Sequence, residues 1–113
     1  MHEMSIARDM IRIIREEMES HGMRRVKSVY LRLGKMTGVI PESLSFCFEV
    51  MIQGTELEGA RLITEVLPLM GMCRECGCRF EIRDYTFLCP SCGSSEVEPV
   101  SGRELEVFEL EGE

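Results

Sequence analysis

The chain has 113 residues and a formal charge of −7, with 44% hydrophobic and 29% charged residues, which is the composition of an ordinary globular protein. This acidic balance argues against nucleic acid and against an anionic membrane surface as partners, because both attract a basic footprint. No apolar run is long enough to span a bilayer and the first residues do not resemble a signal peptide, so we expect a cytoplasmic protein.

The first part of the chain predicts two helices that alternate with two strands. Apolar residues at helical spacing, with Ser5 as N-cap and Gly22 as the stop, predict the first helix. Pro41 can open the second helix and Gly54 can close it. In chain order the expected elements are a helix over 5–20, a strand over 26–33, a helix over 41–54 and a strand over 61–67.

A last strand is predicted over 103–110, with Leu105 and Val107 on one face and Phe108 and Leu110 on the other. Such a strand cannot hide its apolar side chains alone. We therefore expect it to pair with the second predicted strand, which makes the segment between them an insertion.

The expected fold is α+β. Two helices and a three-stranded sheet form one small domain, and an inserted four-cysteine zinc ribbon, a module with rubredoxin-like knuckles, interrupts it. Residues 1–69, completed by the C-terminal strand within 100–113, are expected to form the first domain. Residues 70–99 are expected to form the zinc-binding module.

Two Cys-x-x-Cys pairs, each followed by a glycine, are the strongest motif in the chain. Their members are Cys73, Cys76, Cys89 and Cys92. Two thiolates three positions apart can reach one ion, and two such pairs complete the tetrahedral shell of structural zinc. In a cytoplasmic protein this spacing favours a metal over disulfides. A rubredoxin-like iron centre for electron transfer and a zinc-ribbon interaction or transcription module remain alternatives.

The remaining two cysteines fall outside these pairs. Cys78 forms a Cys-Gly-Cys alternative with Cys76, and we interpret it as a spare thiol that could enter the shell. Cys47 lies on the apolar face of the second predicted helix and is interpreted as a buried small hydrophobic residue.

The N-terminal residues Met1, His2 and Glu3 form a second candidate metal site. The Met1 amine, the backbone nitrogen of His2 and its imidazole Nδ1 can chelate one ion through fused rings, and Glu3 could supply an oxygen. Tetragonal nitrogen and oxygen coordination suits Ni(II) or Cu(II). By composition alone, however, a histidine near a terminus is more often not a ligand. His21 is interpreted as a complement to the dipole at the end of the first helix.

These features together resemble the HypA/HybF family of hydrogenase-maturation nickel metallochaperones. The resemblance rests on the opening Met-His-Glu-Met-Ser-Ile, the amphipathic helix after it and the Cys-x-x-Cys-Gly … Cys-Pro-x-Cys-Gly module, and it covers essentially the whole chain. It implies that His2 and the Met1 amine hold Ni(II) with help from Glu3. It also implies that the four paired cysteines hold structural zinc.

The resemblance further implies a carrier that passes nickel to the precursor of the [NiFe]-hydrogenase large subunit and works with the GTPase HypB. The sequence has no evident nucleophile–base pair and no phosphate-binding glycine loop, so we expect no enzymatic activity in this chain. We expect a monomer or a homodimer.

Overall fold

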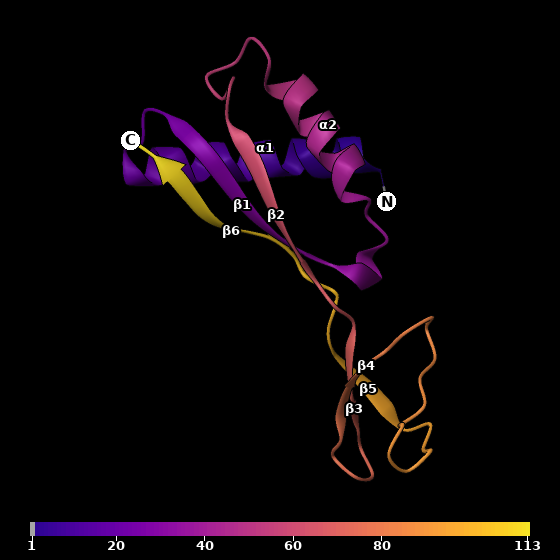
Figure 1. Cartoon of the computed structure of the whole chain (residues 1–113). Coiled ribbons are helices and arrows are strands. Elements are labelled where there is room, and N and C mark those ends of the chain that lie inside the picture. The colour runs from indigo at the N-terminus through magenta and orange to yellow at the C-terminus, as the bar shows by residue number, and fades with distance from the viewer. Residues whose placement is uncertain (1) are drawn as a thin grey trace.

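The computed structural model describes residues 2–113, which build two separate three-stranded sheets and two α-helices. The elements are α1 (Glu3–His21), β1 (Val26–Gly34), the 3₁₀ helix η1 (Lys35–Thr37), α2 (Pro41–Ile52), β2 (Arg61–Leu67), β3 (Met70–Cys73), β4 (Arg79–Glu81), β5 (Val97–Ser101) and β6 (Leu105–Gly112). Figure 1 shows the helices and the first sheet at one end and the second sheet at the other. The radius of gyration is 17.5 Å, whereas a compact domain of this length has about 13 Å, so the molecule is elongated.

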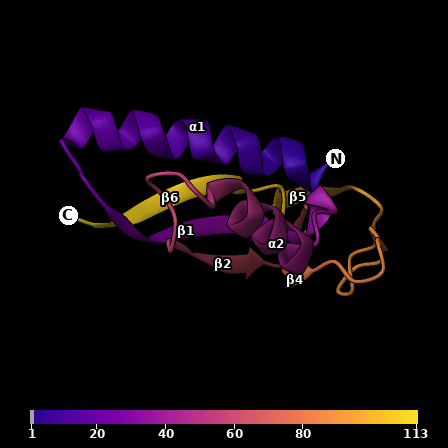
Figure 2. The ribbon, with the colours of Figure 1, turned by 90° about the horizontal axis from the view of Figure 1, so that it is seen from above.

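The first sheet has the strand order β2-β1-β6, with β1 parallel to β2 and antiparallel to β6. The expected pairing of the last strand with β2 is therefore wrong. The reason is the width of the helical layer, because α2 contacts β2 while α1 contacts β6 (Figure 2). Placing β6 on the free edge of β1 gives each helix a strand to cover, and it gives β1 two paired edges.

A β-bulge decides which side chains of β6 face the core. The register between β1 and β6 shifts between Tyr30 and Leu31, which leaves Phe108 as an extra residue without a partner. Val107 and Leu110 consequently both pack against the core, although strict alternation would place them on opposite faces. The predicted placement of Leu110 beside Phe108 is wrong for this reason.

The first helix starts two residues earlier than expected. It begins at Glu3 with His2 as N-cap, and the N–H of Ile6 donates to the His2 carbonyl at 3.2 Å. Ser5 lies exposed inside the first turn, so the prediction of Ser5 as N-cap is wrong. Gly22 ends the helix as predicted, in the left-handed region with φ of 64°. Neither α-helix within residues 2–113 is long and apolar enough to cross a membrane.

The core of the first sheet and the interior of the second differ greatly in size. One hydrophobic cluster joins α1, β1, α2 and the loops beside them; its buried members are Ile6, Ala7, Met10, Ile11, Ile14, Met18, Val26, Val29, Leu31, Leu33, Val39, Leu44, Phe48, Ile52, Leu57 and Ala60. Beyond this cluster, the buried apolar residues are Leu69, Cys73, Ile82 and Cys89. Half of this second, smaller group consists of cysteines, so the second sheet has little apolar core of its own.

The two sheets are joined by two connections, one between β2 and β3 and the other between β5 and β6, which pack against each other. Gly102 has φ of 112°, and a Cβ atom there would lie 2.9 Å from the Cα of Leu69. A Cβ on Gly34 would collide with the backbone of Gly102. The hydroxyl of Ser101 donates to the carbonyl of Pro68 at 3.0 Å. Close backbone packing and a hydrogen bond therefore hold the connections side by side.

Candidate metal centres

The four paired cysteines converge at the far end of the second sheet. Cys73 ends β3 and Cys76 follows in the next turn, while Cys89 and Cys92 lie in the loop between β4 and β5. Their four Sγ atoms all lie within 4.8 Å of one another. The Cys73–Cys92 and Cys76–Cys89 sulfur distances are 3.6 and 3.5 Å. A tetrahedral ion with metal–sulfur bonds of about 2.3 Å would place its sulfurs about 3.8 Å apart, so the donor set fits zinc.

The two Cys-x-x-Cys turns, called here the first and second knuckle, repeat the same hydrogen bonds. In each knuckle, the N–H of the glycine donates to the carbonyl of the first cysteine. The N–H of that same cysteine donates to the carbonyl of the residue that follows the glycine. The bonds are Gly77 N to Cys73 O (2.9 Å), Cys73 N to Cys78 O (2.9 Å), Gly93 N to Cys89 O (2.8 Å) and Cys89 N to Ser94 O (2.9 Å). Both glycines have φ of 76°. Cys78 and Ser94 therefore occupy equivalent positions.

Backbone donors favour the thiolate form of the first cysteine in each knuckle. Burial raises the pKa of Cys89, but the N–H groups of Cys92 and Ser91 outweigh it and lower that pKa to about 6. The Ser91 nitrogen lies 3.4 Å from the sulfur. The N–H of Cys76 likewise holds the pKa of Cys73 below its ordinary value. These donors stabilise negative charge before any ion arrives.

The second cysteine of each knuckle carries the opposite shift. The N–H of Cys78 lowers the pKa of Cys76, but the neighbouring Cys89 thiol and burial raise it to about 12 overall. The N–H of Ser94 similarly fails to offset the neighbouring groups that raise the pKa of Cys92. Four thiolates this close repel one another, and a divalent cation removes that repulsion.

The fifth and sixth cysteines lie outside the four-thiol group. Cys78 is half-buried, and its sulfur lies 3.8 Å from the carbonyl of Arg79. Burial raises the pKa of the Cys78 thiol, and the nearby Cys89 raises it further. Cys47 is partly buried against the main core, as predicted.

His2 is exposed at the start of α1, and Glu3 beside it is half-buried. The His2 backbone is extended, with φ of −89° and ψ of 122°. As the N-cap, His2 precedes the helical ladder, so the helix does not need its amide nitrogen as a donor. The predicted ligand Met1 lies outside the described residues. Figure 1 shows α1 away from the second sheet, and the group of candidate ligands at the four cysteines includes neither His2 nor Glu3.

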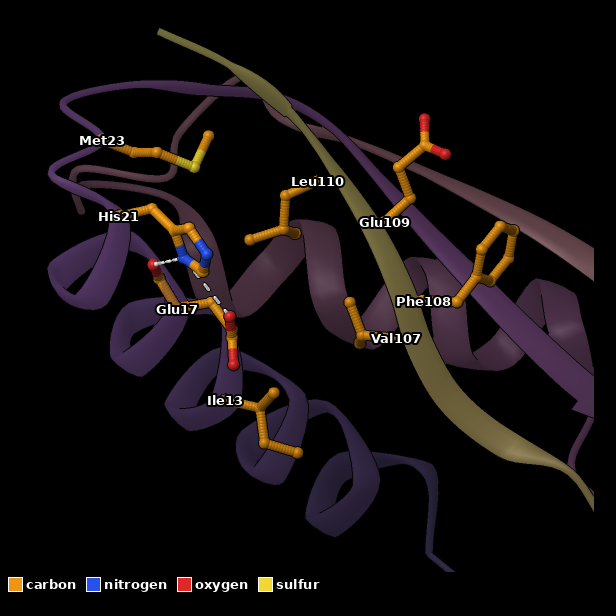
Figure 3. Close-up of a pocket in the computed structure, with 8 residues that line it drawn as sticks. All are labelled: Ile13, Glu17, His21, Met23, Val107, Phe108, Glu109 and Leu110. Atoms are coloured by element: carbon orange, nitrogen blue, oxygen red, sulfur yellow. Dashed lines mark hydrogen bonds and ion pairs between the residues drawn. The ribbon is translucent and has the colours of Figure 1, made fainter.

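His21 lies in a groove of about 310 Å³ between α1 and β6. Its Nδ1 lies 3.0 Å from the carbonyl oxygen of Glu17 and 3.5 Å from the Glu17 carboxylate. Figure 3 shows Val107 and Leu110 lining the groove beside this pair. His21 is thus engaged with the last turn of its own helix, as expected. Within residues 2–113, the four paired cysteines are the only group of three or more candidate ligands close enough to share an ion.

Fold and site together define a small α+β protein whose second sheet carries four thiols that could hold a metal ion. Residues 1–112 match the family described as "Hydrogenase/urease nickel incorporation, metallochaperone, hypA". The "Hydrogenase maturation factor HypA" of Geobacter metallireducens is 46% identical over 113 residues, covering all of both chains, and that of Geotalea uraniireducens is 42% identical over the same span. The chain belongs to the HypA family, and it is a nickel metallochaperone of hydrogenase maturation, not an enzyme.

Two solved structures have the same fold. The solution structure of the Ni metallochaperone HypA from Helicobacter pylori matches with a TM-score of 0.71 at 20% identity, covering 99% of this chain and 97% of that one. A second HypA solution structure matches with a TM-score of 0.73 at 19% identity, covering 98% and 95%. At this level of identity the likeness concerns the fold.

Proposed function

We propose that the chain binds Ni(II) at its N-terminus and delivers it to the precursor of the [NiFe]-hydrogenase large subunit. The ligands are the Met1 amine together with the amide nitrogen and Nδ1 of His2, and Glu3 assists them. The observation that carries this proposal is the position of His2, exposed, extended and ahead of the helical hydrogen bonds. An amide nitrogen outside the ladder can lose its proton to a metal without breaking the helix.

The second metal of the proposal is a structural Zn²⁺ held by Cys73, Cys76, Cys89 and Cys92. The sulfur spacing and the backbone donors around the sulfurs support it. We assign residues 1–69, completed by the last strand within 100–113, to the nickel-binding domain and residues 70–99 to the zinc module, whose strand β5 extends to Ser101. The separation of the two buried clusters supports this division.

The cellular part of the proposal concerns partners and location. The chain works in the cytoplasm with a HypB-type GTPase, as a monomer or homodimer, without nucleic acid or membrane. The family description, which names hydrogenase nickel incorporation, supports a partner in that maturation. Delivery requires that the cargo can leave, and an exposed chelate whose ligands take up protons can release its ion.

The test is a calorimetric Ni(II) titration of four zinc-loaded proteins. The native chain should bind tightly, whereas His2→Ala and a chain extended by residues ahead of Met1 should both lose tight binding. His21→Ala is the matched control, because this histidine already contacts the Glu17 carbonyl. It should bind nickel like the native chain. Native affinity in either the His2→Ala or the extended protein would show that the terminal chelate is wrong.

A further inference from the structure

We propose that Cys78 is a reserve ligand that replaces Cys76 in the four-thiol site. The inference rests on the metal site of the proposed function and concerns a residue outside the four ligands. Its basis is the repeated geometry of the knuckles, in which the first knuckle carries a thiol where the second carries the hydroxyl of Ser94.

The backbone holds Cys78 next to the ligand shell. Its carbonyl accepts the N–H of Cys73, a predicted ligand, at 2.9 Å, so the residue cannot drift away from the first knuckle. Only Gly77, with φ of 76° and no heavy atom within 4 Å of where its Cβ would be, separates Cys78 from Cys76. The bond from Cys73 fixes the Cys78 backbone, and the Cys78 thiol interacts with the Cys89 thiol, so it lies beside the shell.

The exchange takes place at an open corner of the site. Cys73 and Cys89 are buried, whereas Cys76 and Cys92 are exposed. Cys76 can therefore leave the shell into solvent without moving a buried side chain. The half-buried Cys78 sulfur lies 3.8 Å from the Arg79 carbonyl, a weak contact that costs little to lose when the sulfur turns towards the ion.

The chemistry of the exchange is a ligand substitution without oxidation. The bond between the ion and Cys76 breaks and that thiolate takes a proton from water. The Cys78 thiol releases its proton to water as its own bond to the ion forms. The number of thiolates on the ion, and the charge of the site, are the same before and after.

The second knuckle provides the matched control. Its Ser94 hydroxyl accepts the N–H of Glu96 at 3.0 Å and is a weak zinc ligand compared with a thiolate. When the exposed Cys92 is substituted, position 94 therefore offers no thiolate to take its place on the ion. The two knuckles share their backbone bonds, so a difference between them reports the thiol at position 78 and not the general stability of a knuckle.

The experiment compares Cys76→Ser, Cys92→Ser, Cys78→Ser and the double variant Cys76→Ser/Cys78→Ser. Zinc per chain and competitive zinc affinity are measured, and the sulfur-to-cobalt absorption of the Co(II)-substituted proteins counts the bound thiolates. Cys76→Ser and Cys78→Ser should keep a four-thiolate spectrum and native-like affinity. Cys92→Ser and the double variant should lose one thiolate, with affinity at least about 100-fold weaker, the upper end of what losing even a ligand-supporting group costs.

A fall in Cys76→Ser as large as that in Cys92→Ser would overturn the inference, as would a double variant that matches Cys76→Ser. Metal-free native protein would instead contradict the proposed zinc site itself. If a serine variant does not fold, partial alkylation of the folded, zinc-loaded native and Cys78→Ser chains gives the same answer. Chains alkylated only at Cys76 should keep zinc in the native protein and lose it in Cys78→Ser. Equal retention in both would overturn the inference.

Discussion

The Arg15–Glu56 ion pair joins α1 to the loop between α2 and β2, with 2.6 Å between Nε and Oε1. The hydrogen bond from Arg15 is the main reason that the pKa of Glu56 lies below its ordinary value of 4.5. A carboxylate with a lowered folded-state pKa stabilises the fold above its ordinary pKa, and this contribution disappears as the pH falls through the lowered value. Both side chains are about half exposed, at 47% and 49%, so solvent screening keeps the effect small.

Glu56→Gln should therefore lower the free energy of unfolding at pH 7 by at most about 1 kcal/mol. The loss should shrink towards zero well below pH 4.5, because native Glu56 is then protonated as well. Urea unfolding at the two pH values measures this. The control is Glu16→Gln, which breaks the exposed i,i+4 pair with Arg12 and should cost about 0.3–0.5 kcal/mol at pH 7. A Glu56→Gln loss that persists in acid would exclude the ion pair as its cause.

At the scale of elements, α2 presents two phenylalanines of opposite environment. Phe48 is fully buried in the main core, whereas Phe46, two residues earlier, is 67% exposed. A helix turns by 100° per residue, so this spacing places the two rings on different sides of α2. The pair separates the energetic contribution of burial from the general effect of removing an aromatic ring.

Phe48→Ala should lower the free energy of unfolding by about 3–5 kcal/mol, through lost transfer energy and the cavity left behind. Phe46→Ala should change it by no more than about 0.5 kcal/mol. Denaturant unfolding followed by far-UV circular dichroism measures both. Equal losses would contradict the assignment of α2 to the core through its Phe48 face.

Elements whose signals are local could be predicted from the sequence, and long-range pairings could not. The periodic apolar residues of α1 and the glycine at its end predict the helix to within a few residues. The choice of Ser5 as N-cap placed the predicted start two residues too late. The position of β6 depends on how wide the helical layer is, which alternation within one strand cannot indicate. The bulge at Phe108 is likewise visible only once the register with β1 is known.

The same distinction holds for the metal centres. Cysteine spacing predicts the four-thiol group because the geometry of each knuckle lies within a few residues. The equivalent positions of Cys78 and Ser94 follow from the two Cys-x-x-Cys-Gly motifs, whereas the hydrogen bonds that both residues accept are known only from the fold. For His2, the motif alone favoured no metal, so the proposed nickel site depends on the family resemblance.

At the scale of the whole molecule, we expect the two sheets to depend on the proposed zinc to different degrees. The cluster around α1, β1 and α2 consists of apolar side chains, whereas two of the four other buried apolar residues within 2–113 are the cysteines Cys73 and Cys89. A module this small rarely has enough apolar surface to fold alone, so its ion should supply much of its stability.

Zinc removal by a chelator should unfold the second sheet and leave the first sheet folded. Amide hydrogen exchange should show lost protection in β3, β4 and β5, and retained protection in α1 and β1. Readdition of zinc to the reduced protein should restore the lost protection. Loss of protection throughout the chain would contradict two independent cores, and unchanged protection would contradict the structural role of the metal.

The central position of β1 also sets an order of events during synthesis. β1 is translated early, but β6, which pairs with one of its edges, follows the cysteine-bearing segment in the chain. On the ribosome, that edge of β1 stays unpaired until both knuckles have been made, and such late long-range pairing is slow to form. The cysteines are therefore exposed to the cytosol before the sheet beneath α1 is complete, so under the proposed function a newborn chain would acquire its zinc before it can carry nickel.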